Sequence, residues 1–197
     1  PVARALQLPE RELPIDPYLM GYWLGNGNST DYEITVRDSD VEAVRAQIPY
    51  EIKSEVVQPG SHRLRIPALK PILLDSFRDK VIPSEYLWAS EGQRWALLQG
   101  LMDSDGCISR EKSQSVYVST IRQLAESVRE LLWSLGIKNA MTMGPSLRYG
   151  KPTGETLYTI RFTTFADQPT SRLKRKYDRK RERTKKTRSC FHYLQDI

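Results

Sequence analysis

The chain contains few of the residues that build disulfide frameworks or zinc sites. Its 197 residues include two cysteines, Cys107 and Cys190, and two histidines, His62 and His192. Neither pair suggests a disulfide framework or a zinc site. The apolar run at residues 95–102 is short and is interrupted by polar and small residues. We therefore expect no signal peptide, no membrane contact, and an intracellular, cytoplasmic protein.

Net positive charge is absent over most of the chain and is concentrated near its end. The formal net charge is +6, from 30 Lys and Arg against 24 Asp and Glu. Residues 172–188 hold 11 Lys or Arg against two acids, a net of +9, so the remainder is −3. Such a run is typical of a phosphate-binding arm or of a helix that orders on nucleic acid. The alternative is a solvated or disordered tail.

One nine-residue pattern occurs twice, as LMGYWLGNG at residues 19–27 and as LQGLMDSDG at residues 98–106, an offset of 79 residues. Each copy is helix-like until a polar residue followed by glycine, Asn26 or Asp105. Small residues recur four apart, a spacing that lets two helices pack closely: Gly21 and Gly25, then Gly100 and Ser104. The copies therefore predict two adjacent helices that end together, although ordinary amphipathic helices stopped by glycine are the alternative.

The predicted helix ends bring oxygen atoms together. Asn26 and Asp105 would lie side by side, next to the free backbone carbonyls of Gly25 and Ser104. Such hard-oxygen donors suit Mg²⁺ or a similar divalent cation. Asp103 lies two residues before Asp105, about 200° away around a helix axis, and we expect it to be a surface or helix-end polar residue outside the metal site.

The surroundings of the motif are duplicated as well. Alternating apolar residues predict strands at 32–37, 51–57 and 62–66, and again at 115–119, 140–143 and 157–163. Helices are predicted at 41–48 and 124–135, each opened by a capping-box pattern, Ser39 with Glu42 and Thr120 with Gln123. Residues 144–155, rich in Gly and Pro, are predicted to be a loop. Each half thus reads helix, strand, helix, strand, strand and a further helix, an α+β fold with a pseudo-twofold axis.

These motifs resemble the paired signature of the LAGLIDADG homing endonucleases. The stretch KVIPSEYL at residues 80–87 resembles the block ahead of the second motif in intein-encoded (DOD-type) members, and the resemblance covers residues 17–186. The domains expected from it are an N-terminal flank (1–16), a first half with linker (17–92), a second half with the basic segment (93–188) and a C-terminal flank (189–197). The first motif departs from the family, which usually has an acid where this chain has Asn26.

The resemblance implies a monomeric, site-specific endonuclease that hydrolyses a long double-stranded DNA target. It implies Mg²⁺ or Mn²⁺ as cofactor, with Ca²⁺ as a non-cleaving substitute. Asp105 and Asn26 are the expected metal ligands and catalytic residues. The family block implies a catalytic role for Lys80. Arg65 corresponds to Arg161 at an offset of 96, and the same offset makes Lys176 the counterpart of Lys80.

Asn26 should impair cleavage, whether it is an engineered change or a natural decay. The alternative function is a catalytically degenerate DNA- or RNA-binding relative, such as a maturase or a regulator. An intein splicing domain would lie outside these residues, and DNA binding would place the protein at the nucleoid.

Strand alternation also predicts which side chains contact DNA. In the second half, Val116 and Val118 are expected to face the core, which leaves Tyr117 and Ser119 on the outer face. A solvated strand face is the alternative for each residue taken alone. The strand residues expected on DNA are Glu33, Thr35, Arg37, Lys53, Arg63, Arg65, Tyr117, Ser119, Thr159, Arg161 and Thr163, joined by Arg148 and by Arg172, Lys174, Arg175 and Arg179 of the basic segment.

Overall fold

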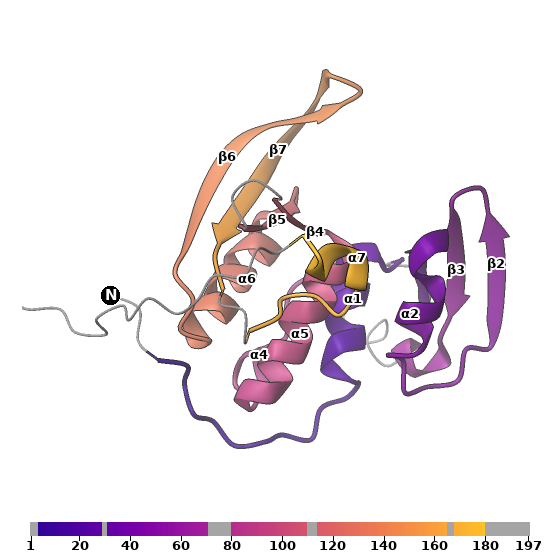
Figure 1. Cartoon of the computed structure of the whole chain (residues 1–197), viewed down its shortest axis with the longest axis horizontal. Helices are drawn as coiled ribbons and strands as arrows, with labels where there is room; N and C mark the ends of the chain where they lie inside the picture. The colour runs from indigo at the N-terminus through magenta and orange to yellow at the C-terminus, as the bar shows by residue number, and fades with distance from the viewer. Residues whose placement is uncertain (1–3, 29–30, 71–79, 110–113, 165–167, 180–197) are drawn as a thin grey trace, which may run out of the picture.

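Two central helices lie between two antiparallel sheets in the computed structural model (Figure 1). The structure describes residues 4–28, 31–70, 80–109, 114–164 and 168–179. The first part of the chain forms α1 (Pro17–Asn26), β1 (Glu33–Arg37), η1 (Asp38–Asp40), α2 (Val41–Arg45), β2 (Ser54–Gln58), β3 (Ser61–Arg65), η2 (Pro67–Leu69) and α4 (Ser84–Leu87). The second part forms α5 (Glu91–Ser104), β4 (Gly106–Ile108), β5 (Ser115–Ser119), α6 (Arg122–Ser134), β6 (Asn139–Arg148), β7 (Lys151–Phe162) and α7 (Lys174–Tyr177).

The two sheets repeat one arrangement with different sizes. The first has three strands in the order β1–β3–β2, and the second has four in the order β4–β5–β7–β6. Helix α2 packs on the first sheet and α6 on the second. The predicted α+β fold with two antiparallel sheets is therefore confirmed. Within the described residues, no helix combines the length and the apolar character needed to cross a bilayer.

Local sequence explains where the central helices begin and end. Asp16 caps α1 by accepting the Leu19 N–H at 3.0 Å, and Pro17 occupies the first turn. Ser90 and Gln93 form a capping box at the start of α5. Asn26 is the last residue of α1, and Asp105 directly follows α5. Both predicted helix ends are confirmed.

Glycine allows α1 and α5 to touch through their backbones. A Cβ atom on Gly21 would lie 2.1 Å from the Leu97 carbonyl oxygen, and one on Gly100 would lie 2.0 Å from the Tyr18 carbonyl oxygen. No side chain fits at either distance. The predicted close packing of the two motifs is confirmed, and these two glycines make it possible.

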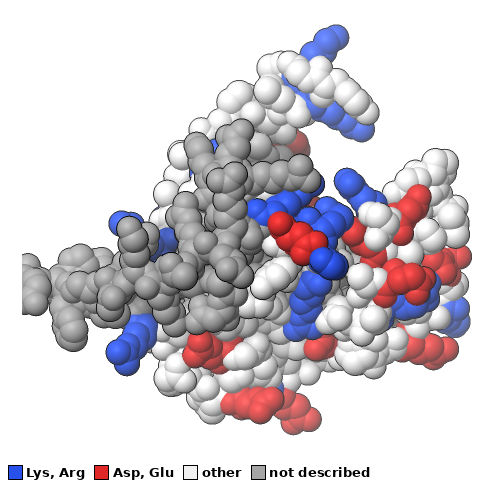
Figure 2. Space-filling view, in the orientation of Figure 1, with Lys and Arg blue, Asp and Glu red and all other residues white. Residues whose placement is uncertain are grey.

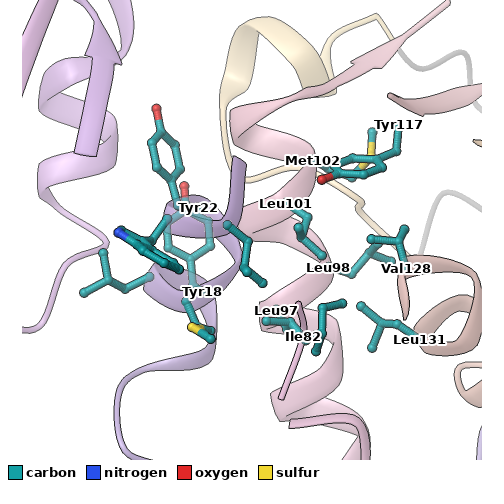
Figure 3. Packing of buried hydrophobic residues seen from close by; sticks show 14 of the residues in the cluster. Tyr18, Tyr22, Ile82, Leu97, Leu98, Leu101, Met102, Tyr117, Val128 and Leu131 are labelled. Carbon is teal, nitrogen blue, oxygen red and sulfur yellow. The ribbon is translucent and has the colours of Figure 1, made fainter. Parts of the chain in front are cut away.

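The core continues outward from this helix pair. Figure 3 shows Tyr18 and Tyr22 of α1 beside the α5 side chains, with Tyr117 and Val128 on the other side of α5. All four are 0–1% exposed. Because α1 is buried from Tyr18 to Leu24, it is an internal helix shared by both halves.

Three local predictions are wrong. Residues 144–155 are not a loop, because β6 and β7 extend into a long hairpin that projects from the body (Figure 1). The capping boxes at Ser39 and Thr120 do not form, since α2 and α6 have no side-chain cap. The Ser39 hydroxyl instead bonds to Asp40 at 3.3 Å, and Ser119 accepts the Ile121 N–H at 3.1 Å.

Gly100→Ala should reduce the free energy of unfolding by about 3 kcal/mol, because its methyl group would meet the Tyr18 backbone and force the helices apart. Gly92→Ala, in the same helix with nothing within 4 Å of the new Cβ, should instead gain about 0.5–1 kcal/mol. Urea denaturation of both variants measures the difference. Equal effects would contradict the close helix contact.

Candidate active site and nucleic-acid interface

The predicted site lies where α1 and α5 end together. A Cβ on Gly25 would lie 2.1 Å from the Ser104 Oγ and 3.2 Å from the Asp105 Cγ. Asp105 therefore stands directly beside the last turn of α1, which ends at Asn26. The Asp105 side chain remains exposed, and Asn26 is partly buried. The structure thus brings the two motif helix ends to one place, where the Asn26 side chain also hydrogen-bonds to that of Tyr22.

Two lysines donate hydrogen bonds into these helix ends in matching ways. Lys80 Nζ donates to the carbonyl oxygens of Gly25 at 3.1 Å and Gly27 at 2.8 Å. Lys176 Nζ donates to those of Ser104 at 3.4 Å and Gly106 at 2.8 Å. The motif offset of 79 makes these two carbonyl pairs equivalent. The structure therefore places Lys80 and Lys176 as counterparts, as the repeat predicts.

Electrostatics explains why cations gather here. Each helix C-terminus carries about half a negative charge, so two adjacent helix ends repel unless cations lie between them. Burial lowers the pKa of Lys176 to about 8, although nearby Asp103 acts in the opposite direction. Burial also lowers the pKa of Lys80. Loss of hydration at the helix ends raises the pKa of the Asp105 carboxyl group, while Lys80 and Lys176 oppose that rise.

The oxygen donors suit one hard cation, but they supply only part of its coordination shell. The carbonyls of Gly25 and Ser104 already accept lysine hydrogen bonds. Asp105 adds a carboxylate and Asn26 a neutral amide oxygen. The described part of the chain holds no group of three or more His, Cys, Asp or Glu side chains suited to a metal. Mg²⁺ commonly takes one or two carboxylates and completes its shell with water and substrate phosphates, so this donor set suits it.

Asp103 is a helix-end residue of α5, one of the two places predicted for it, but the prediction of a surface position is wrong. Its side chain is buried and accepts hydrogen bonds from the Tyr18 hydroxyl at 3.0 Å, the Arg172 N–H at 2.9 Å and the Ser171 hydroxyl. Burial raises the pKa of Asp103, and these hydrogen bonds oppose the rise. Asp103 therefore anchors the segment that carries Lys176. Sequence reasoning missed this role; the one signal was an acid where the first motif copy has Leu24.

The described part of the basic segment folds against the protein. Arg175 forms a two-pronged ion pair with Asp40 of η1, with Nε to oxygen distances of 2.6 and 2.8 Å. Arg172 donates to Gln99 at 2.8 Å and to Gln47 at 2.9 Å. Arg172 and Arg175 thus tie the two halves together, in contrast to the expected arm. Residues 180–188 of the predicted arm lie outside the described residues.

The first sheet presents its predicted residues together. Glu33 pairs with Arg65 and Thr35 with Arg63 across β1 and β3, so these side chains share a face with Arg37. Ile34 and Leu64, on the opposite face, are fully buried. Lys53 is exposed one residue before β2, and its N–H donates to the Arg65 carbonyl at 2.9 Å.

The second sheet has the opposite phase in β5 from the one predicted. Tyr117 is fully buried opposite Ile160, so it is not available to DNA. The tyrosine ring buries more apolar surface than a valine, and the core takes Tyr117 while Val116 lies opposite Arg161. Ser119 is on the Tyr117 face and bonds to the Ile121 N–H. Both residues are removed from the predicted interface.

The remaining predicted contacts lie on the other face of the second sheet and beyond it. Arg161 is exposed and donates to Thr142 at 2.9 Å, and Thr159 lies two residues before it on β7. Thr163 directly follows β7. Lys174 pairs with Asp178 at 2.7 Å. Figure 2 shows blue side chains over α7 and at the tip of the β6–β7 hairpin, where Arg148 lies opposite Lys151.

Residues 92–164 match the model of the LAGLIDADG-like domain. The structure is similar to the crystal structure of I-DmoI in complex with DNA and Mn, with a TM-score of 0.51, 16% identity, and coverage of 76% of this chain and 89% of that one. A structure of mesophilic variants from the homing endonuclease I-DmoI gives a TM-score of 0.50, 17% identity, and coverage of 76% and 84%. The LAGLIDADG homing endonuclease fold of this chain is thereby shown, and the predicted resemblance is confirmed.

The chain is also similar in sequence to a helicase. The replicative DNA helicase DnaB of Mycobacterium intracellulare is 33% identical over 195 residues, which are 99% of this chain and 32% of the relative. This chain therefore spans about a third of the length of that relative.

Lys176→Met should remove a pH-dependent part of the stability. Because the Lys176 pKa falls from 10.5 to about 8 on folding, the unfolded chain holds more protons between these values, and stability rises with pH in this window. From about pH 7.5 to about pH 9.5 this increment is about 1–2 kcal/mol. Urea denaturation at both pH values should show a smaller rise in the variant. The same rise in both proteins would contradict the buried lysine.

Proposed function

We propose that this chain is a site-specific DNA endonuclease of the homing type, with activity lowered by Asn26. The observation that carries the proposal is the pair of helix ends, where Asp105, Asn26, Lys80 and Lys176 converge. Phosphodiester hydrolysis needs an activated water, neutralised phosphate charge and a stabilised leaving oxygen. Paired cations and an exposed carboxylate at one spot, beside two sheets with arginine-bearing faces, suit this reaction.

Asp105 and Asn26 would hold a divalent cation, Mg²⁺ or Mn²⁺, which supplies Lewis-acid stabilisation of phosphate charge and acidifies water when bound. The LAGLIDADG-fold structures that this chain resembles were determined with DNA and Mn or Mg, which supports this cofactor class. Ca²⁺ would bind the same oxygens without supporting cleavage.

The chain's own lysines would act on the substrate charge through space, since Lys176 is buried and its Nζ donates to backbone carbonyls. The ammonium groups of Lys80 and Lys176 lie at the helix ends and would offset the charge of a phosphate placed there. Asp105 accepts hydrogen bonds from a water and orients it. Asn26 offers an oxygen of the same shape but no negative charge, so the first half-site, at Asn26, contributes less to holding the cation than the second half-site, at Asp105.

DNA would lie across the exposed sheet faces. Arg37, Arg63 and Arg65 from one sheet and Thr159 and Arg161 from the other would contact bases and phosphates. One chain supplies both motifs, so we propose a monomer. Because a nuclease fold aligns with one third of a replicative helicase, we further propose that the chain is intein-encoded, with the uninterrupted helicase coding sequence as target. It would act inside the cell, at the nucleoid.

A second candidate is a DNA-binding relative that no longer cleaves, and one observation favours it. Asn26 removes one of the two carboxylates that a symmetric site would have, while the packing of the two helices is kept. The two candidates differ in metal-dependent nicking, which the binder lacks.

Asn26→Asp should raise Mg²⁺-dependent double-strand cleavage about 100-fold, because a carboxylate restores negative charge at the first half-site. Cleavage of a duplex carrying the uninterrupted helicase sequence measures this. Mg²⁺ should also raise the melting temperature of Asn26→Asp more than that of the parent protein. Asn139→Asp, which adds the same charge at the start of β6, is the control and should change neither quantity. Unchanged cleavage and unchanged metal response would refute the proposed site.

Asp105→Asn should abolish residual nicking by the parent protein, because it removes the carboxylate of the site. DNA affinity should stay unaltered, because Asp105 is exposed and the fold does not depend on it. Glu126→Gln, which removes an exposed carboxylate on α6, is the matched control. Gel analysis of a supercoiled substrate measures nicking. Persistent nicking by Asp105→Asn contradicts the endonuclease proposal, whereas binding without nicking in both the parent and Asn26→Asp favours the binder.

A further inference from the structure

The tip of the β6–β7 hairpin holds a tyrosine in a backbone conformation that tyrosine disfavours. Arg148 pairs with Lys151, and the two residues between them turn the chain. Tyr149 has φ of +50° and Gly150 has φ of +78°. Positive φ at both central residues is the pattern of a type I′ turn, which favours Asn or Asp followed by Gly. Glycine fits its position, but tyrosine is strained.

Packing within the protein does not offset this strain. Tyr149 is 95% exposed, and its ring contact is with the neighbouring Arg148 guanidinium, 5.9 Å from the ring centre. Leu147 is 58% exposed beside it. An exposed aromatic ring that folding does not require, held in a strained turn, indicates a contact made outside the chain.

The charge around the ring identifies the partner. Arg148 and Lys151 flank the turn, and Figure 2 shows blue side chains at this tip. The strand that follows, β7, carries Arg161 on its exposed face. Aromatic rings next to cations suit nucleic acid, because rings stack on bases while cations bind phosphates. The matching hairpin of the first half turns through Pro59 and Gly60 between Gln58 and Ser61, without an aromatic or a cation.

We propose that Tyr149 stacks on a base at the outer end of the DNA bound by the second half, with Arg148 and Lys151 on the flanking phosphates. The irregular pairing between Pro145 and Leu147 redirects the strand just before the tip. The inference rests on the proposed DNA-binding function and adds a contact that exists in one half only. One end of the target is therefore distorted by the protein and the other is not.

Tyr149→Asn tests the proposal because Asn fits the turn and removes the ring. The variant should melt at the same or a higher temperature than the parent, yet bind the helicase-sequence duplex about 10-fold more weakly. Tyr149→Phe keeps the ring and should bind like the parent. Trp133→Ala removes another exposed aromatic, on α6, and should not alter binding.

Fluorescence of 2-aminopurine, placed at successive positions of the duplex, reports the stacked base directly. The parent and Tyr149→Phe should change the fluorescence at a position near one end, and Tyr149→Asn should not. Equal binding and equal fluorescence for the parent and Tyr149→Asn would overturn this inference alone. A lower melting temperature for Tyr149→Asn would overturn its premise of strain. A parent protein that binds no DNA would overturn the proposed function as well.

Discussion

The close contact between α1 and α5 determines the positions of all other functional groups. Because Gly21 and Gly100 let the two backbones touch, the helices have one relative position and end at one level. Asp105 then lies beside Gly25, and the last backbone carbonyls of the two helices lie close to one another. A separation larger by one methyl group would move these ends apart and split the site into two unrelated surfaces.

That contact places two negative helix C-termini next to each other, and the two lysines offset their repulsion. They reach equivalent carbonyls by different routes, since Lys80 follows Gly25 by 55 residues and Lys176 follows Ser104 by 72. The longer route contains the extended β6–β7 hairpin and ends in a segment fixed by Asp103 and Asp40. The charged positions at the helix ends are thus kept in both halves, while the chain between them differs.

Local signals allowed the helix ends and the pairing of lysines to be predicted, because glycine spacing and motif offset are readable in the sequence. The phase of β5 was not, since Val116 and Tyr117 are both apolar and either face could be buried. The burial of Asp103 depends on Ser171, 68 residues away, which no local pattern reveals. The Pro and Gly residues of the hairpin predict a loop, but β6 is an edge strand, where proline is tolerated.

The unequal hairpins have a consequence for orientation. The helix pair alone is nearly symmetric, and a symmetric body can sit on a duplex in either of two directions. The first sheet ends in a short proline-glycine turn, and the second extends into a long cationic hairpin. In the proposed DNA complex, this difference gives the protein a polarity, so that one strand of the target is always presented to Asp105 and the other to Asn26.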